Sequence, residues 1–474
     1  MFDRDRRVRG IFASLIDSAL FVSRVGPLRE AILKVLTPVV RSSIMLAQQE
    51  VSNRAILADK TDMMLALIHS TMRSGVHKKT VRIMMKKIFF NRERKLTELK
   101  FLLKNGFRPP SFITISPGKR CNLKCKYCYA NATTDEEKLS HYVFSRIILE
   151  AKKFWGTRFF VISGGEPLLW QDAGMTVLDI AKANLDTIFL VYTNGTLING
   201  DVLNQLYEYA NILPAISIEG LKTITDERRG KGIFERVSTV MRELKKRNIA
   251  FGISMTATRE NCEELLSDET ISYYFEELGA SFGWIFHYMP IGRDPVPELM
   301  PTPEQREWMW QRTWEIIRKK KILLADFWNH GTVSNGCISS ARSGGYFYID
   351  WNGNITPCVF FPYTTMNINR LYEDGKTINA IFEDEFFLAI RCWQRDYGYK
   401  KTELIRNNDW LRPCPIRDHH KIARMLIKRY NAVLIDGNDP GINCDDFIKS
   451  LEDYDRRLAD RIGPLWEDRY VQKG

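Results

Sequence analysis

Short apolar runs alternate with amphipathic stretches through the middle of the chain. Between these runs lie stretches of helical periodicity, such as 142–155 and 202–210. Strand–helix alternation is typical of a parallel sheet, either open or curled into a barrel. Six apolar runs within about 180 residues predict a partial (β/α)6 barrel of TIM type, in an α/β fold, rather than a complete eightfold barrel. The predicted strands are 112–116, 159–163, 188–193, 215–219, 251–257 and 283–289.

Other patterns flank this region. The first hundred residues are rich in Leu, Ile, Met and Arg, and Ile11, Phe12, Leu15 and Ile16 recur at helical spacing. A helix is predicted over 302–320, followed by a segment with turns and further cysteines, and the chain ends in a charged helical tail. The predicted units are a helical extension (1–107), the barrel (108–300), a small metal-stabilised C-terminal domain (301–425) and the tail (426–474).

The positive charge of the chain is concentrated in the extension. The net charge is +12, but the first 110 residues carry 22 Lys and Arg against 9 Asp and Glu, and the rest carry 47 against 48. Within 78–100, basic residues surround an apolar stripe, as in helices that lie on a membrane interface. This pattern predicts contact with an anionic surface, of phospholipid headgroups or of nucleic acid. A bundle packed on the barrel, with a solvated basic face, is an equal alternative.

The cysteine content indicates a reducing compartment. There are nine Cys, at irregular spacing, and neither a secretory signal nor a run of 18 uncharged apolar residues is evident. We therefore expect a cytoplasmic protein, which the basic extension would allow to lie peripherally on the inner face of the cell membrane. In that compartment clustered cysteines indicate metal binding or catalysis rather than disulfides.

Three cysteines follow the first predicted strand at close spacing. They are Cys121, Cys125 and Cys128, with Tyr127 just before the last. A structural zinc site is normally closed by four protein ligands, and no fourth Cys lies nearby. Three thiolates without a fourth suit a [4Fe–4S] cluster with one iron left open.

This spacing resembles the signature of the radical S-adenosylmethionine (SAM) superfamily. The resemblance implies that the open iron binds SAM and that one electron from the cluster cleaves SAM to a 5′-deoxyadenosyl radical. Later predicted strands end in segments that also resemble family motifs, although Glu219 and Thr225 stand where the family has Asp and His. By this resemblance, the SAM-binding residues are Tyr127, Gly164, Gly165, Glu166, Pro167, Thr193, Asn194, Ser217, Glu219 and Arg229.

Cysteines beyond residue 330 resemble the auxiliary-cluster domain of the SPASM and twitch branches of that superfamily. The similar segments are Gly336-Cys337, the turn Asp350–Gly353 before Pro357-Cys358, and Pro413-Cys414. They imply one auxiliary [4Fe–4S] cluster on Cys337, Cys358 and Cys414. The fourth position would be taken by Cys392, by a ligand other than Cys, or by substrate. A structural zinc ion at the same cysteines is the alternative.

The substrate is predicted from the extension. A basic amphipathic extension suits a membrane surface, so the first hypothesis is hydrogen abstraction from a membrane lipid or another acyl or isoprenoid chain. The alternative is peptide or protein maturation, the usual activity of SPASM-type enzymes. tRNA modification is a second alternative, although the lack of aromatic–basic interleaving disfavours nucleic acid as a partner. Each case requires a one-electron donor such as ferredoxin or flavodoxin.

Overall fold

The fold is described from a computed structural model. It covers residues 53–399, 409–436 and 443–471, with a few positions between 31 and 44. The helical spacing predicted over 11–19 lies outside these described residues.

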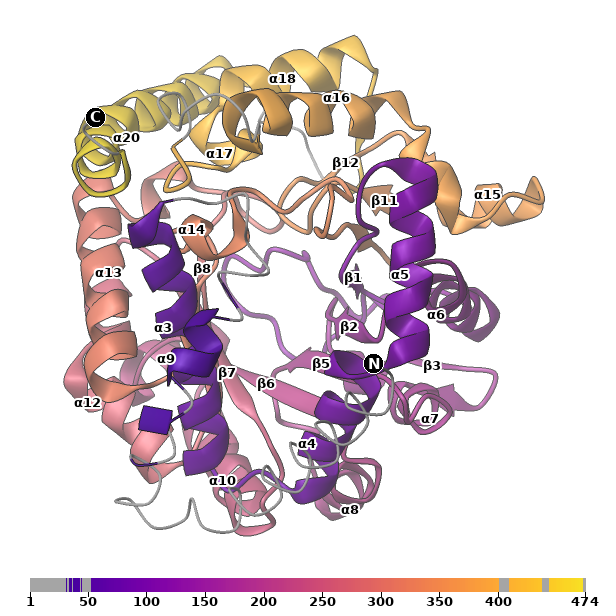
Figure 1. The fold of residues 1–474 in the computed structure, drawn as a ribbon, viewed down its shortest axis with the longest axis vertical. Coiled ribbons are helices and arrows are strands. Elements are labelled where there is room, and N and C mark those ends of the chain that lie inside the picture. Colours follow the sequence, from indigo (N-terminus) through magenta and orange to yellow (C-terminus); the bar gives the residue numbers. More distant parts are fainter. Residues whose placement is uncertain are drawn as a thin grey trace.

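The main element is a ten-stranded sheet with the order β13-β11-β10-β1-β2-β5-β6-β7-β8-β9. The strands from β10 to β9 in this order run parallel to one another, and they curve around the centre of the barrel (Figure 1). This confirms the predicted partial barrel. The barrel strands are β1 (Ile113–Ile115), β2 (Phe159–Ile162), β5 (Ile188–Thr193), β6 (Ile212–Ile218), β7 (Gly252–Ala257), β8 (Phe282–His287) and β9 (Leu324–Asp326). All six predicted strands are present, and β9 is a seventh that the sequence analysis did not identify.

Helices follow the barrel strands and cover their outer side (Figure 1). They are α6 (His141–Trp155), α7 (Val177–Lys182), α8 (Gly200–Tyr209), α9 (Lys222–Arg229), α10 (Ile233–Lys246), α11 (Cys262–Leu265), α12 (Asp268–Ile271), η3 (Ser272–Glu277), α13 (Pro303–Glu315) and η5 (Ile316–Lys320). Local chemistry sets the bounds of α6. The Ser140 side chain accepts a hydrogen bond from the Val143 amide, and Gly156 ends the helix in a left-handed conformation with φ of 71°.

The C-terminal part extends the same sheet. Strand β10 (Tyr348–Ile349) pairs with β1, and β11 (Asn354–Thr356) and β13 (Met366–Asn367) follow in antiparallel order. The helices of this part are α14 (Gly331–Ser334), α15 (Ile368–Glu373), η6 (Ile378–Phe382), α16 (Glu385–Gln394), η7 (Arg395–Tyr399), α17 (Pro415–Asp418), α18 (His420–Arg429) and α20 (Asp445–Tyr470). Its strand β12 (Tyr363–Thr364) pairs with β14 (Val433–Leu434). A second two-stranded pair, β3 (Gln171–Asp172) with β4 (Met175–Thr176), lies after β2 in the sequence. Short 3₁₀ turns lie at η2 (Pro167–Leu169) and η4 (Pro297–Leu299).

The described part of the N-terminal extension packs on the barrel. Its helices are α3 (Arg54–Arg73), α4 (Lys78–Ile83), η1 (Met84–Phe89) and α5 (Arg92–Asn105). Asp59 on α3 is fully buried, and its carboxylate accepts hydrogen bonds from Thr332 at 2.9 Å and Tyr470 at 2.7 Å and pairs with Arg318 at 2.7 Å. These contacts join α3 to both the C-terminal part and the last helix.

The basic stretch 78–100 is not one continuous helix. It is interrupted at Phe90 and Asn91, where the Asn91 side chain caps α5. Its apolar stripe faces the barrel, since Ile83, Met84 and Ile88 pack with residues at the start of β2, β5 and β6. This arrangement agrees with the packed-bundle alternative for these residues. No helix in the described ranges is long and apolar enough to cross a membrane.

Candidate functional site

The loop after β1 carries the three clustered cysteines. Its backbone is held at both ends, by bonds from the Cys121 amide to the Thr133 carbonyl at 2.9 Å and from the Asn131 amide to the Cys128 carbonyl at 3.0 Å. Arg293, which lies outside the loop, also bonds to it. The Arg293 guanidinium donates to the Cys125 carbonyl at 2.7 Å, and the Arg293 backbone amide donates to the Cys128 carbonyl at 3.0 Å. The sequence analysis assigned no role to Arg293.

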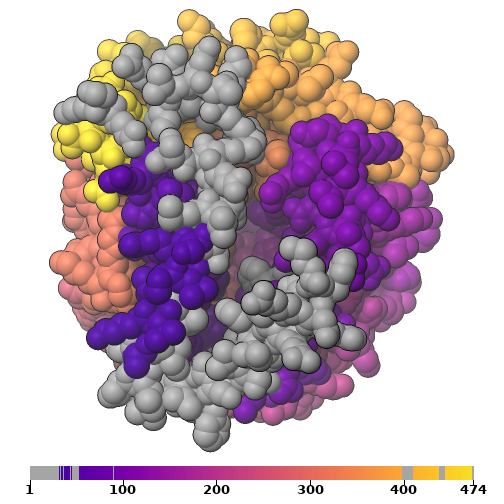
Figure 2. All heavy atoms as spheres, viewed as in Figure 1, coloured from indigo at the N-terminus to yellow at the C-terminus, as the bar shows by residue number. Residues whose placement is uncertain are grey.

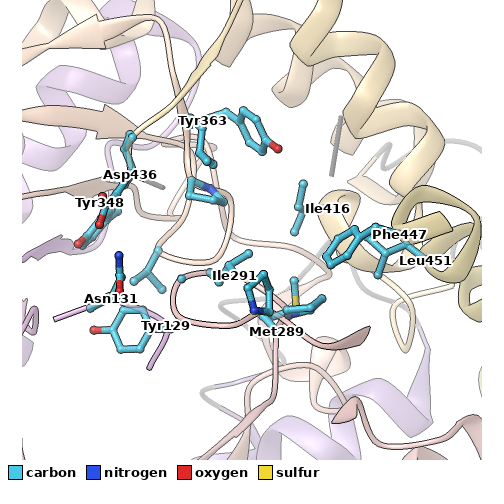
Figure 3. A pocket seen from close by; sticks show the side chains of 18 of the residues that line it. Tyr129, Asn131, Met289, Ile291, Tyr348, Tyr363, Ile416, Asp436, Phe447 and Leu451 are labelled. Atoms are coloured by element: carbon cyan, nitrogen blue, oxygen red, sulfur yellow. The ribbon is translucent and has the colours of Figure 1, made fainter. Parts of the chain in front are cut away.

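All three thiols line one cavity of about 230 Å³ inside the barrel. Of the thirteen residues predicted around the first cluster and SAM, ten line this cavity, while Glu166, Pro167 and Glu219 do not. The residues that do are Cys121, Cys125, Cys128, Tyr127, Gly164, Gly165, Thr193, Asn194, Ser217 and Arg229. A smaller cavity of about 80 Å³ is lined by Tyr129, Asn131 and Met289 among others (Figure 3). Tyr129 and Met289 also line the first cavity.

The two glycines after β2 allow the cysteine loop to approach. Gly164 has a φ of +119°, which disfavours any side chain. A Cβ at Gly165 would lie 2.2 Å from the Lys119 carbonyl oxygen and 2.3 Å from that of Arg120. The Gly165 and Glu166 amides donate to the loop carbonyls of Gly118 at 3.0 Å and Arg120 at 2.8 Å. The pair is therefore needed for close backbone contact beside Cys121.

Glu166 connects two of the predicted motifs. Its buried carboxylate accepts hydrogen bonds from the Thr193 hydroxyl and the Asn194 amide, both at 2.7 Å. Burial raises the pKa of Glu166, and these hydrogen bonds partly oppose the rise. Glu166 thus orients Thr193 and Asn194, whose side chains border the cavity.

Glu219 supports two arginines that face the cavity. Its carboxylate is fully buried and pairs with both Arg228 and Arg229. Burial alone would lower the pKa of Arg229, but the Glu219 carboxylate and the Cys125 thiol outweigh it, so that the pKa is raised. The Nε atom of Arg229 is buried without a hydrogen-bond partner. Arg228, which also lines the cavity, was not predicted.

These residues fit an iron–sulfur cluster with SAM beside it. Three thiols supply the donors that Fe–S clusters prefer, and the unpaired Nε of Arg229 is a donor suited to a carboxylate such as that of SAM. Burial raises the pKa of Cys121 to about 11 and also raises that of Cys125, so metal binding there must release protons. In the described residues, no group of three or more His, Cys, Asp or Glu has the arrangement of a single-ion site.

The downstream cysteines Cys337, Cys358 and Cys414 line a third and larger cavity, of about 440 Å³. The Tyr346 hydroxyl lies 2.8 Å from the Cys358 sulfur. Burial raises the pKa of both Cys358 and Cys414. Three thiols on one wall fit the predicted auxiliary cluster. Cys392 lies on α16 and is not part of this lining, so its role as a fourth ligand stays a prediction.

A network of buried polar side chains borders the cavities of about 230 Å³ and about 440 Å³. The His287 ring donates from Nε2 to Asp326 at 3.0 Å and accepts at Nδ1 from Arg417 at 3.1 Å. The His330 ring accepts a hydrogen bond at Nδ1 from the backbone amide of Asp326 at 3.0 Å, and its Nε2 lies 3.1 Å from the Thr313 hydroxyl. His330 borders the cavity of about 440 Å³, but both of its ring nitrogens already take part in hydrogen bonds, which indicates a structural role.

Comparisons with known proteins agree with this geometry. Residues 115–267 match the family model described as "Radical SAM superfamily". The chain is similar to the AdoMet-dependent heme synthases of Methanosarcina barkeri (28% identical over 341 residues, 62% of this chain and 92% of that protein) and Oleidesulfovibrio alaskensis (30% over 279 residues, 53% and 70%). It is also similar to the antilisterial bacteriocin subtilosin biosynthesis protein AlbA of Bacillus subtilis (24% over 305 residues, 61% and 63%). Among solved structures, SuiB of Streptococcus suis bound to S-adenosylmethionine aligns with a TM-score of 0.51 at 18% identity, over 63% of this chain and 72% of that one, which is a likeness of fold.

Proposed function

The chain belongs to the radical SAM superfamily, and on that premise we propose that it is an enzyme that abstracts a hydrogen atom from a peptide substrate. The family uses a [4Fe–4S] cluster and SAM, which together supply a 5′-deoxyadenosyl radical when bound. We assign Cys121, Cys125 and Cys128 to hold the cluster. The electron would come from a donor such as ferredoxin or flavodoxin.

The observation that carries this assignment is the single cavity shared by the three thiols, Gly164 and Gly165, and the Arg228–Arg229 pair. In the proposed mechanism the two arginines bind the carboxylate of SAM, and Glu219 keeps them in place. The barrel wall excludes water, which protects a reactive radical from unwanted hydrogen donors.

The names of the relatives support the peptide substrate. AlbA is named for bacteriocin biosynthesis, and other relatives are a sporulation killing factor maturation protein and an anaerobic sulfatase-maturating enzyme. The heme synthases indicate that related proteins also act on tetrapyrroles. None of these relatives is named for a lipid or for tRNA, so the comparisons favour the peptide alternative over the first hypothesis from the sequence.

A lipid or isoprenoid chain is the second candidate, because of one structural observation. The cavity of about 440 Å³ is lined mainly by apolar side chains, and no Lys or Arg occurs in its described lining. Such a surface suits hydrocarbon and offers no cation for the carboxylates of a tetrapyrrole.

The test is anaerobic. The protein is reconstituted with iron and sulfide, supplied with reductant and SAM, and assayed for 5′-deoxyadenosine with a peptide fraction or a lipid fraction of the host. Cys128→Ala should abolish product, whereas Cys444→Ala, at an exposed cysteine, should not. A yield raised by peptides supports the proposal, and one raised by lipids supports the second candidate. No product from a fully loaded protein would contradict the enzyme assignment.

A further inference from the structure

The cavity of about 230 Å³ and the cavity of about 440 Å³ adjoin each other. They share seven lining residues, so one wall belongs to both. These residues are Phe112, Phe159, Leu190, Trp284, Phe327, Tyr346 and Phe360. Six of them are aromatic, and Phe112 stacks on Tyr346 with ring centroids 4.8 Å apart. The larger cavity therefore lies beside the one that Cys121, Cys125 and Cys128 line. We call the larger one, the cavity of about 440 Å³, the barrel chamber.

The N-terminal helices form the far wall of the barrel chamber. Met63, Leu67 and Thr71 on α3 line it at every fourth residue, and Thr80 on α4 and Met84 on η1 follow with the same spacing, after Val76 in the connection between the helices. Residues four apart lie on one face of a helix, so each stripe presents one face to the chamber. Opposite them are residues at the beginnings of strands, such as Leu213 and Phe282. Helices α3 and α5 lie on one face of the molecule (Figure 2).

The one carboxylate in the described lining of the chamber is already engaged. Asp326 pairs with His287 and accepts hydrogen bonds from the amides of Trp328 at 3.0 Å and Asn329 at 2.9 Å. The described lining contains no Lys, Arg or Glu. A peptide bond moved into such a space would lose its hydrogen bonds to water without replacing them, which is unfavourable for each of its polar groups. The chamber thus favours hydrocarbon over peptide backbone.

We infer that the barrel chamber binds an uncharged hydrocarbon group of the substrate, between the thiols of the first cluster site and those of Cys337, Cys358 and Cys414. This inference rests on the proposed radical SAM function and narrows its substrate. The hydrocarbon belongs either to a lipid chain or to apolar side chains of a peptide whose backbone stays outside. The volume of the barrel chamber, about 440 Å³, is within the range of about 300–1,000 Å³ that is typical of small-molecule sites.

Filling the chamber tests this inference. The probe is 1-dodecanol, titrated by calorimetry into the cluster-loaded protein with SAM under anaerobic conditions. Leu67→Trp and Thr71→Trp, made separately, place an indole in the chamber and should each weaken dodecanol binding at least tenfold. Ala58→Trp adds the same ring at an exposed position on the same helix and should leave binding unchanged. SAM cleavage without substrate, measured as 5′-deoxyadenosine, checks that each variant is folded.

The outcomes separate the inference from the function on which it rests. Equal dodecanol binding by all four proteins, or no binding by the wild type, overturns the inference even where SAM is cleaved. If the cluster-loaded wild type does not cleave SAM, the proposed function is contradicted instead. A second titration with a capped peptide rich in Leu and Phe identifies the source of the hydrocarbon. Displacement of dodecanol by the peptide supports side chains, and dodecanol binding that the peptide leaves intact supports a lipid chain.

Discussion

Replacing Gly165 by alanine should displace the cysteine loop without removing any ligand. The added Cβ would lie 2.2 Å and 2.3 Å from two backbone carbonyl oxygens, those of Lys119 and Arg120. Ordinary contact begins near 3.5 Å, so one backbone segment must retreat by about 1 Å. The backbone of Arg120 leads directly into Cys121, and the Glu166 amide bonded to the Arg120 carbonyl would move as well.

The expected effect is larger on activity than on stability. Overpacking of this kind costs about 1–3 kcal/mol of folding free energy. A displacement of about 1 Å at a reacting centre reduces rates by about 100-fold. We therefore expect Gly165→Ala to remain folded, to bind less iron, and to form 5′-deoxyadenosine about 100-fold more slowly than the wild type.

Three measurements decide the outcome, namely iron and sulfide content, the rate of 5′-deoxyadenosine formation, and the thermal unfolding midpoint. Gly200→Ala is the matched control, because a Cβ at Gly200, the first residue of α8, meets nothing within 4 Å. It should behave as the wild type in all three. A Gly165→Ala protein with full iron content and a rate within about threefold of the wild type would refute the steric argument.

Two further predictions concern buried charge. Glu219→Gln leaves Arg228 and Arg229 without their buried anion, so the free energy of unfolding measured with denaturant should fall by about 3–5 kcal/mol and the affinity for SAM should fall with it. Glu227→Gln, in an exposed pair with Lys126, should change stability by less than about 0.5 kcal/mol, and equal effects of the two variants would contradict the role of Glu219. Burial lowers the pKa of His287 and of His330 to about 4, from an ordinary value of 6.5. Between these values the unfolded chain binds more protons than the folded one, so stability should decrease as the pH falls from about 6.5 to about 4. Denaturant titrations across this range test this, and a His330→Asn variant with the same slope as the wild type would argue against a neutral buried ring.

The local motifs were predictable because their chemistry is contained in a few adjacent residues. Cys121, Cys125 and Cys128 belong to one loop, and the spacing of apolar runs placed that loop after the first strand. The ends of parallel strands meet at one edge of a barrel, so Gly164 and Asn194 were expected near the same site, and both line its cavity.

Residues that act through distant contacts were not predictable. Arg293 reaches the cysteine loop from the segment after β8, and this bond between residues 168 positions apart in the sequence was not predicted. Glu219 was predicted to contact SAM, which stays a prediction; its pairing with Arg228 and Arg229 and its place outside the described cavity lining became visible only in the structure. Strand β9 has three residues, too few for a clear pattern.

The amino-acid sequence alone predicted the superfamily, the partial barrel and the three cysteines that line the first cavity, because short-range spacing encodes each of them. The tertiary structure decided where the apolar stripe of the N-terminal helices faces, that Cys337, Cys358 and Cys414 line one cavity, and that this cavity adjoins the first. An apolar stripe in the sequence indicates that one face of a helix is buried, but it does not indicate which surface covers that face. That surface depends on how the sheet curls and which strand ends come to lie beneath the helix, which is a property of the whole fold.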